Sequence, residues 1–118
     1  MDSLKSYSCI IKATLEKYIS LAQSAKSYRP PNNNTETFLV IDDSQEQYIW
    51  MTVGWQNDRR VCGMTVYIRL HQDKIWIEED CTEDGIAIDL IKAGIPKDKI
   101  VFGFHNPQLR EYREFLVV

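Results

Sequence analysis

The sequence has little of what several protein classes require. Its 118 residues contain three cysteines, Cys9, Cys62 and Cys81, without C-x-x-C spacing. This pattern argues against a disulfide framework and a zinc site and favours reduced thiols. No run approaches the roughly 18 apolar residues of a membrane span, and the first residues lead into a polar, amphipathic stretch. We therefore expect a soluble, cytoplasmic protein.

Short motifs of several enzyme classes are also missing from the sequence. The five glycines are spread singly from Gly54 to Gly103, so neither a P-loop nor a G-x-G-x-x-G motif occurs. No serine follows Ser44, and none lies in a G-x-S-x-G elbow. None of the eight lysines has Asp or Glu two positions before it, the arrangement common in restriction-type nucleases. We predict that the chain is not an enzyme and binds neither a cofactor nor a metal.

An excess of basic residues is missing as well. Asp and Glu outnumber Lys and Arg by 17 to 14, which gives a formal net charge of -3. This balance argues against a protein that coats the phosphate backbone by charge alone. The length and the 44% hydrophobic content can support one packed core without metal or disulfide staples. Residues 1–118 are therefore expected to form a single domain.

Helical periodicity dominates the N-terminal part of the chain. Apolar residues at helical spacing predict an amphipathic helix from about Ser3 to about Ala25. The apolar stripe consists of Leu4, Tyr7, Ile11, Leu15, Tyr18 and Ala22. Such a helix is about 33 Å long, as long as a domain of this size is wide, so part of it is expected to pack on another subunit. Prolines and asparagines in Lys26–Thr35 predict a loop.

Short β-branched and aromatic runs follow from Glu36 onward. They predict strands at Thr37–Ile41, Gln47–Trp55, Val61–Leu70 and Ile75–Ile77. The connections, including the polar Gln56–Arg60, are too short for parallel crossovers, so the strands form an antiparallel meander. Alternation places Met64, Val66, Ile68 and Leu70 on one face, which needs the long helix as a cover. Tryptophans among the strands, and large apolar residues on both faces of the second, favour a homo-oligomer.

The remaining residues predict a second helix and a short extended segment. Thr82 can cap the helix, with Glu83 in its first turn, and Gly94 suits a left-handed stop. Ile100–Phe104 is expected to be extended, and a turn and a helical turn follow through Tyr112. The fold class is α+β: a long N-terminal helix packed on a four-stranded antiparallel meander, then a second helix and a short C-terminal extended segment.

Several short motifs follow one another between Val53 and Tyr112. They are Val53-Gly54-Trp55, Asp58-Arg59-Arg60-Val61, Lys74-Ile75-Trp76-Ile77, Gly85-Ile86-Ala87, Gly94-Ile95-Pro96-Lys97 and Gly103-Phe104-His105. With them the chain closely resembles, over essentially its whole length, the XisI family, the fdxN element excision controlling factor proteins. The resemblance implies an accessory protein of site-specific DNA rearrangement in heterocyst-forming bacteria. It also implies association with a recombinase and with XisH, a nuclease-like companion, and it supplies no catalytic residues.

Two charged segments are candidates for partner binding. Arg59 and Arg60, close to Trp55, could grip a partner carboxylate by bidentate hydrogen bonds. A solvated turn is the favoured alternative, and DNA phosphate is the third. Glu78 and Asp80 converge on one face of a strand, and Glu83 follows. For this acidic run a solvated strand end is favoured over a partner-facing patch, and a metal site comes last.

Two further residues are weaker candidates. His105 stands in a family motif, where we favour a structural hydrogen bond over partner contact and over catalysis. Arg110 covers the surface near the C-terminus, with partner contact as the alternative. The preferred function is a non-enzymatic regulatory subunit that controls DNA excision by binding an XisH-like or recombinase partner, contacting DNA only indirectly. The alternative is a direct DNA-binding, excisionase-like architectural factor.

Overall fold

Two helices and a five-stranded sheet make up the protein in a computed structural model, which describes residues 3–24 and 33–105. The elements are α1 (Ser3–Ser24), β1 (Asn33–Asp42), β2 (Gln47–Gln56), β3 (Arg59–His71), β4 (Lys74–Asp80), α2 (Ile86–Lys92), a short 3-10 helix (Lys97–Lys99) and β5 (Ile100–Phe102). No helix in these two ranges is long and apolar enough to cross a membrane.

The sheet has the strand order β1-β2-β3-β4-β5. Strands β1 to β4 pair antiparallel with their neighbours in sequence, which confirms the meander. The strand count was predicted one too low, because Ile100–Phe102 joins the sheet as β5, parallel to β4. The intervening α2 provides the long connection that a parallel neighbour requires. The α+β class is confirmed, with a mixed rather than purely antiparallel sheet.

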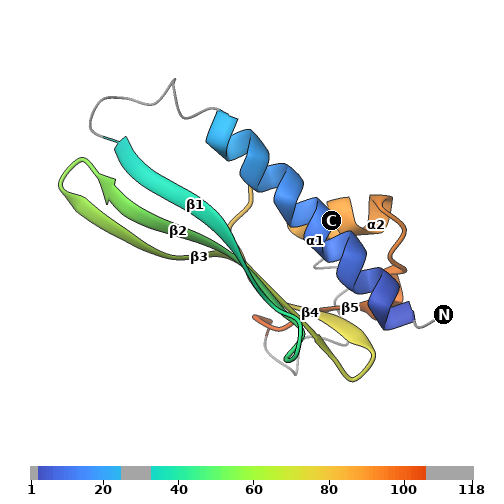
Figure 1. The fold of residues 1–118 in the computed structure, drawn as a ribbon. Coiled ribbons are helices and arrows are strands. Elements are labelled where there is room, and N and C mark those ends of the chain that lie inside the picture. Colours follow the sequence, from blue (N-terminus) through green and yellow to red (C-terminus); the bar gives the residue numbers. More distant parts are fainter. Residues whose placement is uncertain (1–2, 25–32, 106–118) are drawn as a thin grey trace.

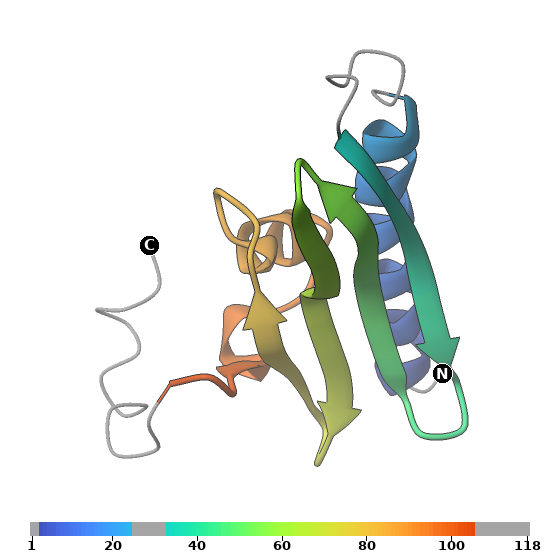
Figure 2. The same ribbon diagram turned by 90° about the vertical axis from the view of Figure 1, so that its left-hand side faces the viewer.

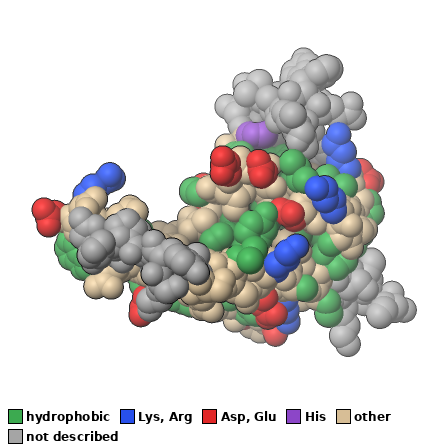
Figure 3. Space-filling view, turned by 90° about the horizontal axis from the view of Figure 1, so that it is seen from above, with side chains coloured by type: hydrophobic (Ala, Val, Ile, Leu, Met, Phe, Trp, Pro, Cys, Tyr) green, Lys and Arg blue, Asp and Glu red, His purple; other side chains and the backbone are tan. Residues whose placement is uncertain are grey.

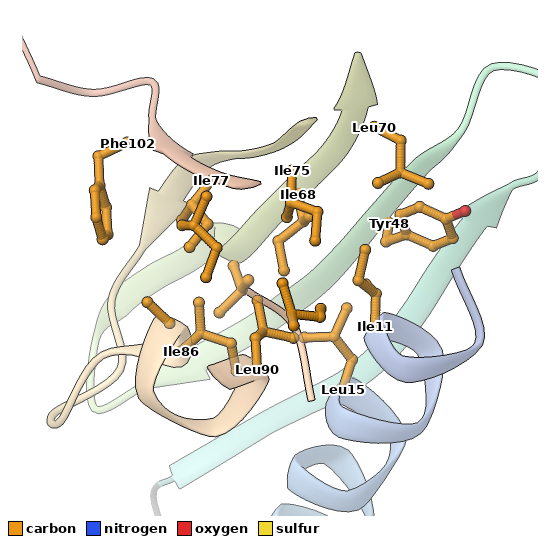
Figure 4. Close-up of a cluster of buried hydrophobic side chains, with 14 residues drawn as sticks. Ile11, Leu15, Tyr48, Ile68, Leu70, Ile75, Ile77, Ile86, Leu90 and Phe102 are labelled. Atoms are coloured by element: carbon orange, nitrogen blue, oxygen red, sulfur yellow. The ribbon is translucent and has the colours of Figure 1, made fainter. Parts of the chain in front are cut away.

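Both helices cover the same face of the sheet (Figures 1 and 2). Between the two layers lies one core cluster, shown in Figure 4. From α1, Ile11 and Leu15 are fully buried, as the predicted stripe requires. From β3 and α2, Ile68 and Leu90 meet them in the same cluster. The long helix is therefore the cover that the predicted apolar face of the meander needed.

One member of the predicted apolar row of β3 does not face the helices. Val66, Ile68 and Leu70 are buried, whereas Met64 is 40% exposed. The pairing of β3 with β2 shifts register between Trp50 and Met51, where a β-bulge inserts Thr65. One extra residue reverses the alternation of side chains beyond it, so Met64 lies on the opposite face.

Several predicted boundaries move when tertiary pairing is included. Asn33–Thr35, expected to be loop, pairs with the end of β2 as strand. The predicted connection Gln56–Arg60 shrinks to a tight turn in which Asn57 adopts a left-handed φ of 57°. The second helix begins after Gly85, not at Thr82, and Gly94 takes the predicted left-handed conformation at φ 115°. Predictions for residues 25–32 and 106–118, including Arg110, fall outside the described residues.

The distal part of β1–β3 extends beyond the rest of the sheet (Figure 1). Val66 pairs with Asp80, the last residue of β4, and the Cys81 N–H donates to the Thr65 carbonyl at 2.8 Å. Residues 59–64 of β3 lie beyond this point and pair with β2. We call the strand segments 33–38, 51–56 and 59–64 the β arm, and the sheet face opposite α1 and α2 the open face.

Candidate partner-binding site

Three of the predicted site residues line one pocket between the end of β4, the start of α2 and the end of β5. Asp80, Glu83 and His105 contribute to this acidic pocket, which has a volume of about 290 Å³. Its other lining residues are Thr82, Asp84, Gly85, Ala87, Ile88, Phe102 and Phe104. The lining thus combines acidic and apolar side chains, and Phe104 is 50% exposed. Figure 3 shows acidic side chains beside a histidine on this side of the molecule.

Asp80 holds the pocket together through hydrogen bonds within the chain. Its Oδ1 accepts from the Thr82 amide at 3.0 Å and from the Thr82 hydroxyl at 2.5 Å. Its Oδ2 accepts from the amide of Ile86, the first residue of α2, at 2.8 Å. The carboxylate therefore caps a free N–H at the helix start, the role that sequence reasoning gave to Thr82. Glu83 and Asp84 are exposed and remain available to a partner.

Glu78 is also engaged within the chain. Its Oε2 lies 2.5 Å from Nε of Arg69, whose guanidinium lies over the Trp76 ring at 5.6 Å. A Cβ on Gly103 would come within 2.1 Å of Glu78 Oε1, so a larger residue there would displace the carboxylate from its present position. Glu78 and Asp80 thus make stabilising contacts within the chain. Of the predicted acidic patch, only the loop that follows them, with Glu83, remains available to a partner.

His105 packs against two aromatic rings. Its ring centroid is 5.2 Å from that of Phe102 and 4.7 Å from that of Phe104. Its backbone N–H donates to the Phe102 carbonyl at 3.1 Å. The side-chain hydrogen bond favoured from the sequence is not formed with any described residue, and Nδ1 is buried without a partner in this part of the chain. Aromatic packing, not hydrogen bonding, positions His105 at the pocket.

The second candidate group lies at the tip of the β arm. The guanidinium of Arg60 lies over the Trp55 ring at 5.7 Å and donates to the Gly54 carbonyl at 3.3 Å. Arg60 pairs with Trp55 and Arg59 with Gln56, so the two arginines project from opposite faces of the hairpin. They cannot act as one bidentate pair on the same group.

The structure separates the two candidate groups. Asp80 pairs with Val66 of β3, and Arg59 precedes Val66 by seven residues in the same strand. At the usual rise per residue, Arg59 and Val66 are about 23 Å apart. The Trp55–Arg60 pair, and Arg59 on the opposite face of the hairpin, are therefore both separate from the pocket of Asp80, Glu83 and His105. A single protein partner could reach both only by lying along the sheet.

Sequence reasoning missed a groove between α1 and α2. It has a volume of about 510 Å³ and is lined by Ala13, Thr14, Lys17, Tyr18, Leu21, Asp89, Lys92 and Ala93. Figure 3 shows apolar side chains in the middle of this side of the molecule, with charged side chains around them. The Tyr18 hydroxyl donates to Asp89 Oδ2 across the groove. No sequence signal joins two residues that are 71 positions apart.

The Tyr18–Asp89 hydrogen bond predicts a pH-dependent contribution to stability. The bond to Asp89, with burial as the second cause, raises the pKa of Tyr18 from 10.0 to about 12. The neutral phenol is therefore favoured in the folded state, so its contribution is complete below pH 10 and is lost as the pH rises toward 12. Tyr18→Phe should lower the free energy of unfolding by about 1.5 kcal/mol at pH 8. Urea titrations should show this difference disappearing by pH 12; a pH-independent difference would contradict the assignment.

Cys9, Cys62 and Cys81 are free and exposed. Desolvation, together with the neighbouring Glu79 carboxylate, raises the pKa of the Cys81 thiol, which keeps it protonated at neutral pH. Within residues 3–24 and 33–105, no group of three or more His, Cys, Asp and Glu side chains could hold a metal ion.

The fold and the site define a class: a small two-layer α+β protein with an acidic pocket at the β4–α2–β5 junction. The family model described as XisI protein matches residues 1–117, and the chain belongs to the XisI family. The crystal structure of fdxN element excision controlling factor XisI from Anabaena variabilis ATCC 29413 is similar, with 36% identity and a TM-score of 0.76. The match covers 92% of this chain and 99% of that one.

A second solved structure gives the same assignment. An XisI-like protein from the same organism has 28% identity and a TM-score of 0.64, with 87% of this chain and 94% of that one covered. No curated protein matches the chain.

Proposed function

We propose that the protein is a non-enzymatic regulatory subunit that controls site-specific DNA excision of the fdxN element type. It acts by binding a nuclease-like XisH-type or recombinase partner, and it contacts DNA only indirectly. Its setting is the cytoplasm of a heterocyst-forming bacterium, where it works as a homo-oligomer. The observation that carries the proposal is membership of the XisI family, in which a similar solved protein is named an excision controlling factor.

The acidic pocket supports partner binding by its chemistry. A nuclease or recombinase presents a cationic surface to DNA, and exposed carboxylates such as Glu83 and Asp84 can occupy such a surface. Phe104, 50% exposed beside them, offers an apolar anchor of the kind that dominates binding energy at interfaces. Carboxylates around an aromatic anchor fit a cationic protein groove better than they fit DNA, whose phosphates they repel.

Reversing one pocket charge tests this proposal. Glu83→Lys should raise the dissociation constant of the complex with the XisH-like partner by about 5- to 30-fold, because attraction is replaced by repulsion. Glu16→Lys makes the same charge change at an exposed position of α1 and should change affinity less than about twofold. Titration calorimetry of the copurified partner with each variant gives the comparison. Equal affinities for wild type and Glu83→Lys would exclude the acidic pocket as the partner site.

The excisionase-like alternative is tested with the isolated protein. We expect its binding to duplex DNA to be weak, independent of sequence and abolished by moderate salt, because the chain carries a net charge of -3. Arg59→Ala with Arg60→Ala should leave folding nearly unchanged, since both side chains are exposed. Tight sequence-specific binding that this double variant loses would establish the alternative and refute control through a partner alone.

A further inference from the structure

The two faces of the β arm have opposite character. Side chains directly paired across neighbouring strands share a face. The buried Tyr48 identifies the even-numbered residues of β2 as those that face the helices. Along the β arm this helix-side face carries small or polar residues, with Val61 as the exception. Its other members are Thr35, Thr37, Thr52, Gly54 and Gly63, with Gln56 and Arg59 at the tip.

The open face of the same strands is mostly apolar, with polar and charged residues toward the tip of the β arm. Its side chains form cross-strand rows: Val40, Ile49 and Tyr67; Phe38, Met51 and Met64; Glu36, Val53 and Cys62; and Asn34, Trp55 and Arg60. Phe38, Val40 and Met64 are each 40% exposed, and Trp55 is 50% exposed. A half-covered antiparallel sheet normally turns its apolar side to the core and its polar side to water. Here the larger apolar side chains of the arm lie on the side away from α1 and α2.

We infer that the open face is the interface of a homodimer, in which the sheets of two copies pack face to face about a two-fold axis. Contiguous apolar surface of this extent marks an interaction site in proteins that are stable in water. Strands β1 to β3, about 4.8 Å apart and each covering about 33 Å of this face, give it a flat footprint of about 480 Å². That footprint is more than half of the roughly 800 Å² per partner of a standard interface.

The charges at the margins of the open face favour a second copy as the occupant. Arg60 lies in the row at the tip of the β arm, whereas Glu79 pairs with Tyr67, which lies in the row at the other end of this apolar set. A two-fold axis through the middle of the rows and perpendicular to the strands brings the Arg60 row of one copy onto the Tyr67 row of the other. Arg60 of each copy then approaches Glu79 of its partner, so one surface complements itself in charge as well as in apolar content.

Sedimentation of the full chain tests the interface. At 20 µM the wild type should sediment with twice the 13.8 kDa mass of one chain. Phe38→Lys places a charge in the row of Met51 and Met64, between the Val40 and Glu36 rows, and should raise the dimer dissociation constant at least about 30-fold, the scale of an interface hot spot. Leu21→Lys is the matched control, because Leu21 is also an exposed apolar residue, at 59%, but lies on α1. This variant should remain dimeric.

Exchanging the charges of Arg60 and Glu79 tests the two-fold packing of the sheets even if Phe38→Lys fails to fold. Arg60→Glu and Glu79→Arg should each raise the dissociation constant about 3- to 10-fold, and the double variant should recover wild-type dimerisation. A wild-type monomer at 20 µM would overturn the inference. So would a dimer that persists in folded Phe38→Lys, or single charge variants that the double variant does not rescue. A wild-type monomer would also refute the homo-oligomeric state in the proposed function. Control through a partner keeps its own test, because none of these outcomes depends on the acidic pocket.

Discussion

Replacing Gly54 with alanine is expected to lower the free energy of unfolding by about 3 kcal/mol. Gly54 has a φ of 140°, which residues with a side chain rarely adopt. A Cβ at this position would lie 2.2 Å from the Asn34 carbonyl oxygen and 2.7 Å from the Thr35 Cα. These contacts are with the backbone of β1, so relief requires the start of that strand to move away from β2. Urea denaturation followed by circular dichroism measures the change.

Gly63 provides the control in the neighbouring strand. It belongs to β3 in the same β arm, and a Cβ there would meet nothing within 4 Å. Gly63→Ala should therefore change stability by less than about 0.5 kcal/mol, or stabilise the strand slightly by reducing the entropy of the unfolded chain. Equal losses in the two variants would show that glycine flexibility, rather than close approach of β1, determines the effect.

Asp80→Ala is expected to destabilise the protein by about 3 kcal/mol. The substitution removes three hydrogen bonds that a single carboxylate makes to Thr82 and to the first amide of α2. Loss of a helix cap alone costs about 1 kcal/mol, and the remaining charge-assisted bonds add to it. Thermal and chemical unfolding of the purified variant measure the loss.

Two further variants separate the cap from the charge. Asp80→Asn keeps one acceptor oxygen and should lose about half as much stability as Asp80→Ala. Glu83→Ala removes a nearby carboxylate that is exposed and should change stability by less than about 0.5 kcal/mol. If Glu83→Ala were as damaging as Asp80→Ala, general loss of negative charge, and not the hydrogen bonds of Asp80, would explain the effect.

Local signals in the sequence were sufficient for most of the fold. Helical spacing located α1, and its fully buried residues Ile11 and Leu15 belong to the predicted stripe, whereas the buried Ile19 does not. Short polar turns between β-branched runs fixed the antiparallel meander, because such turns allow no other connection. Gly94 marked the end of α2 through the left-handed conformation that glycine adopts readily.

The features that escaped prediction depend on pairing over long distances. The parallel partnership of β5 with β4 is formed only after α2 has returned the chain to the sheet edge. The bulge at Thr65, which moves Met64 to the open face, is visible only in the register of two strands. The opposite directions of Arg59 and Arg60 follow from their being strand residues, whereas a polar connection was expected.

For the candidate site, the acidic segment could be located from the sequence, but the contacts that each carboxylate makes could not. Glu78 and Asp80 were grouped with Glu83 because alternation on a strand and proximity in sequence suggested one patch. In the fold, Glu78 forms an ion pair with Arg69, and Asp80 accepts a hydrogen bond from the first amide of α2. Hydrogen-bond partners on other elements decide which carboxylates remain available, and periodicity carries no information about them.

The contact between α1 and the rest of the core has a kinetic consequence. Hairpins of the meander close over short separations, whereas α1 joins the core through pairs such as Ser8 with Tyr48 and Tyr18 with Asp89, which are 40 and 71 residues apart. Closing such long loops costs more conformational entropy than forming a hairpin. On a ribosome, α1 emerges first, but its apolar stripe is fully covered only after the strands of the sheet and α2 have followed. The N-terminal helix is therefore the first element synthesised and among the last to reach its final place.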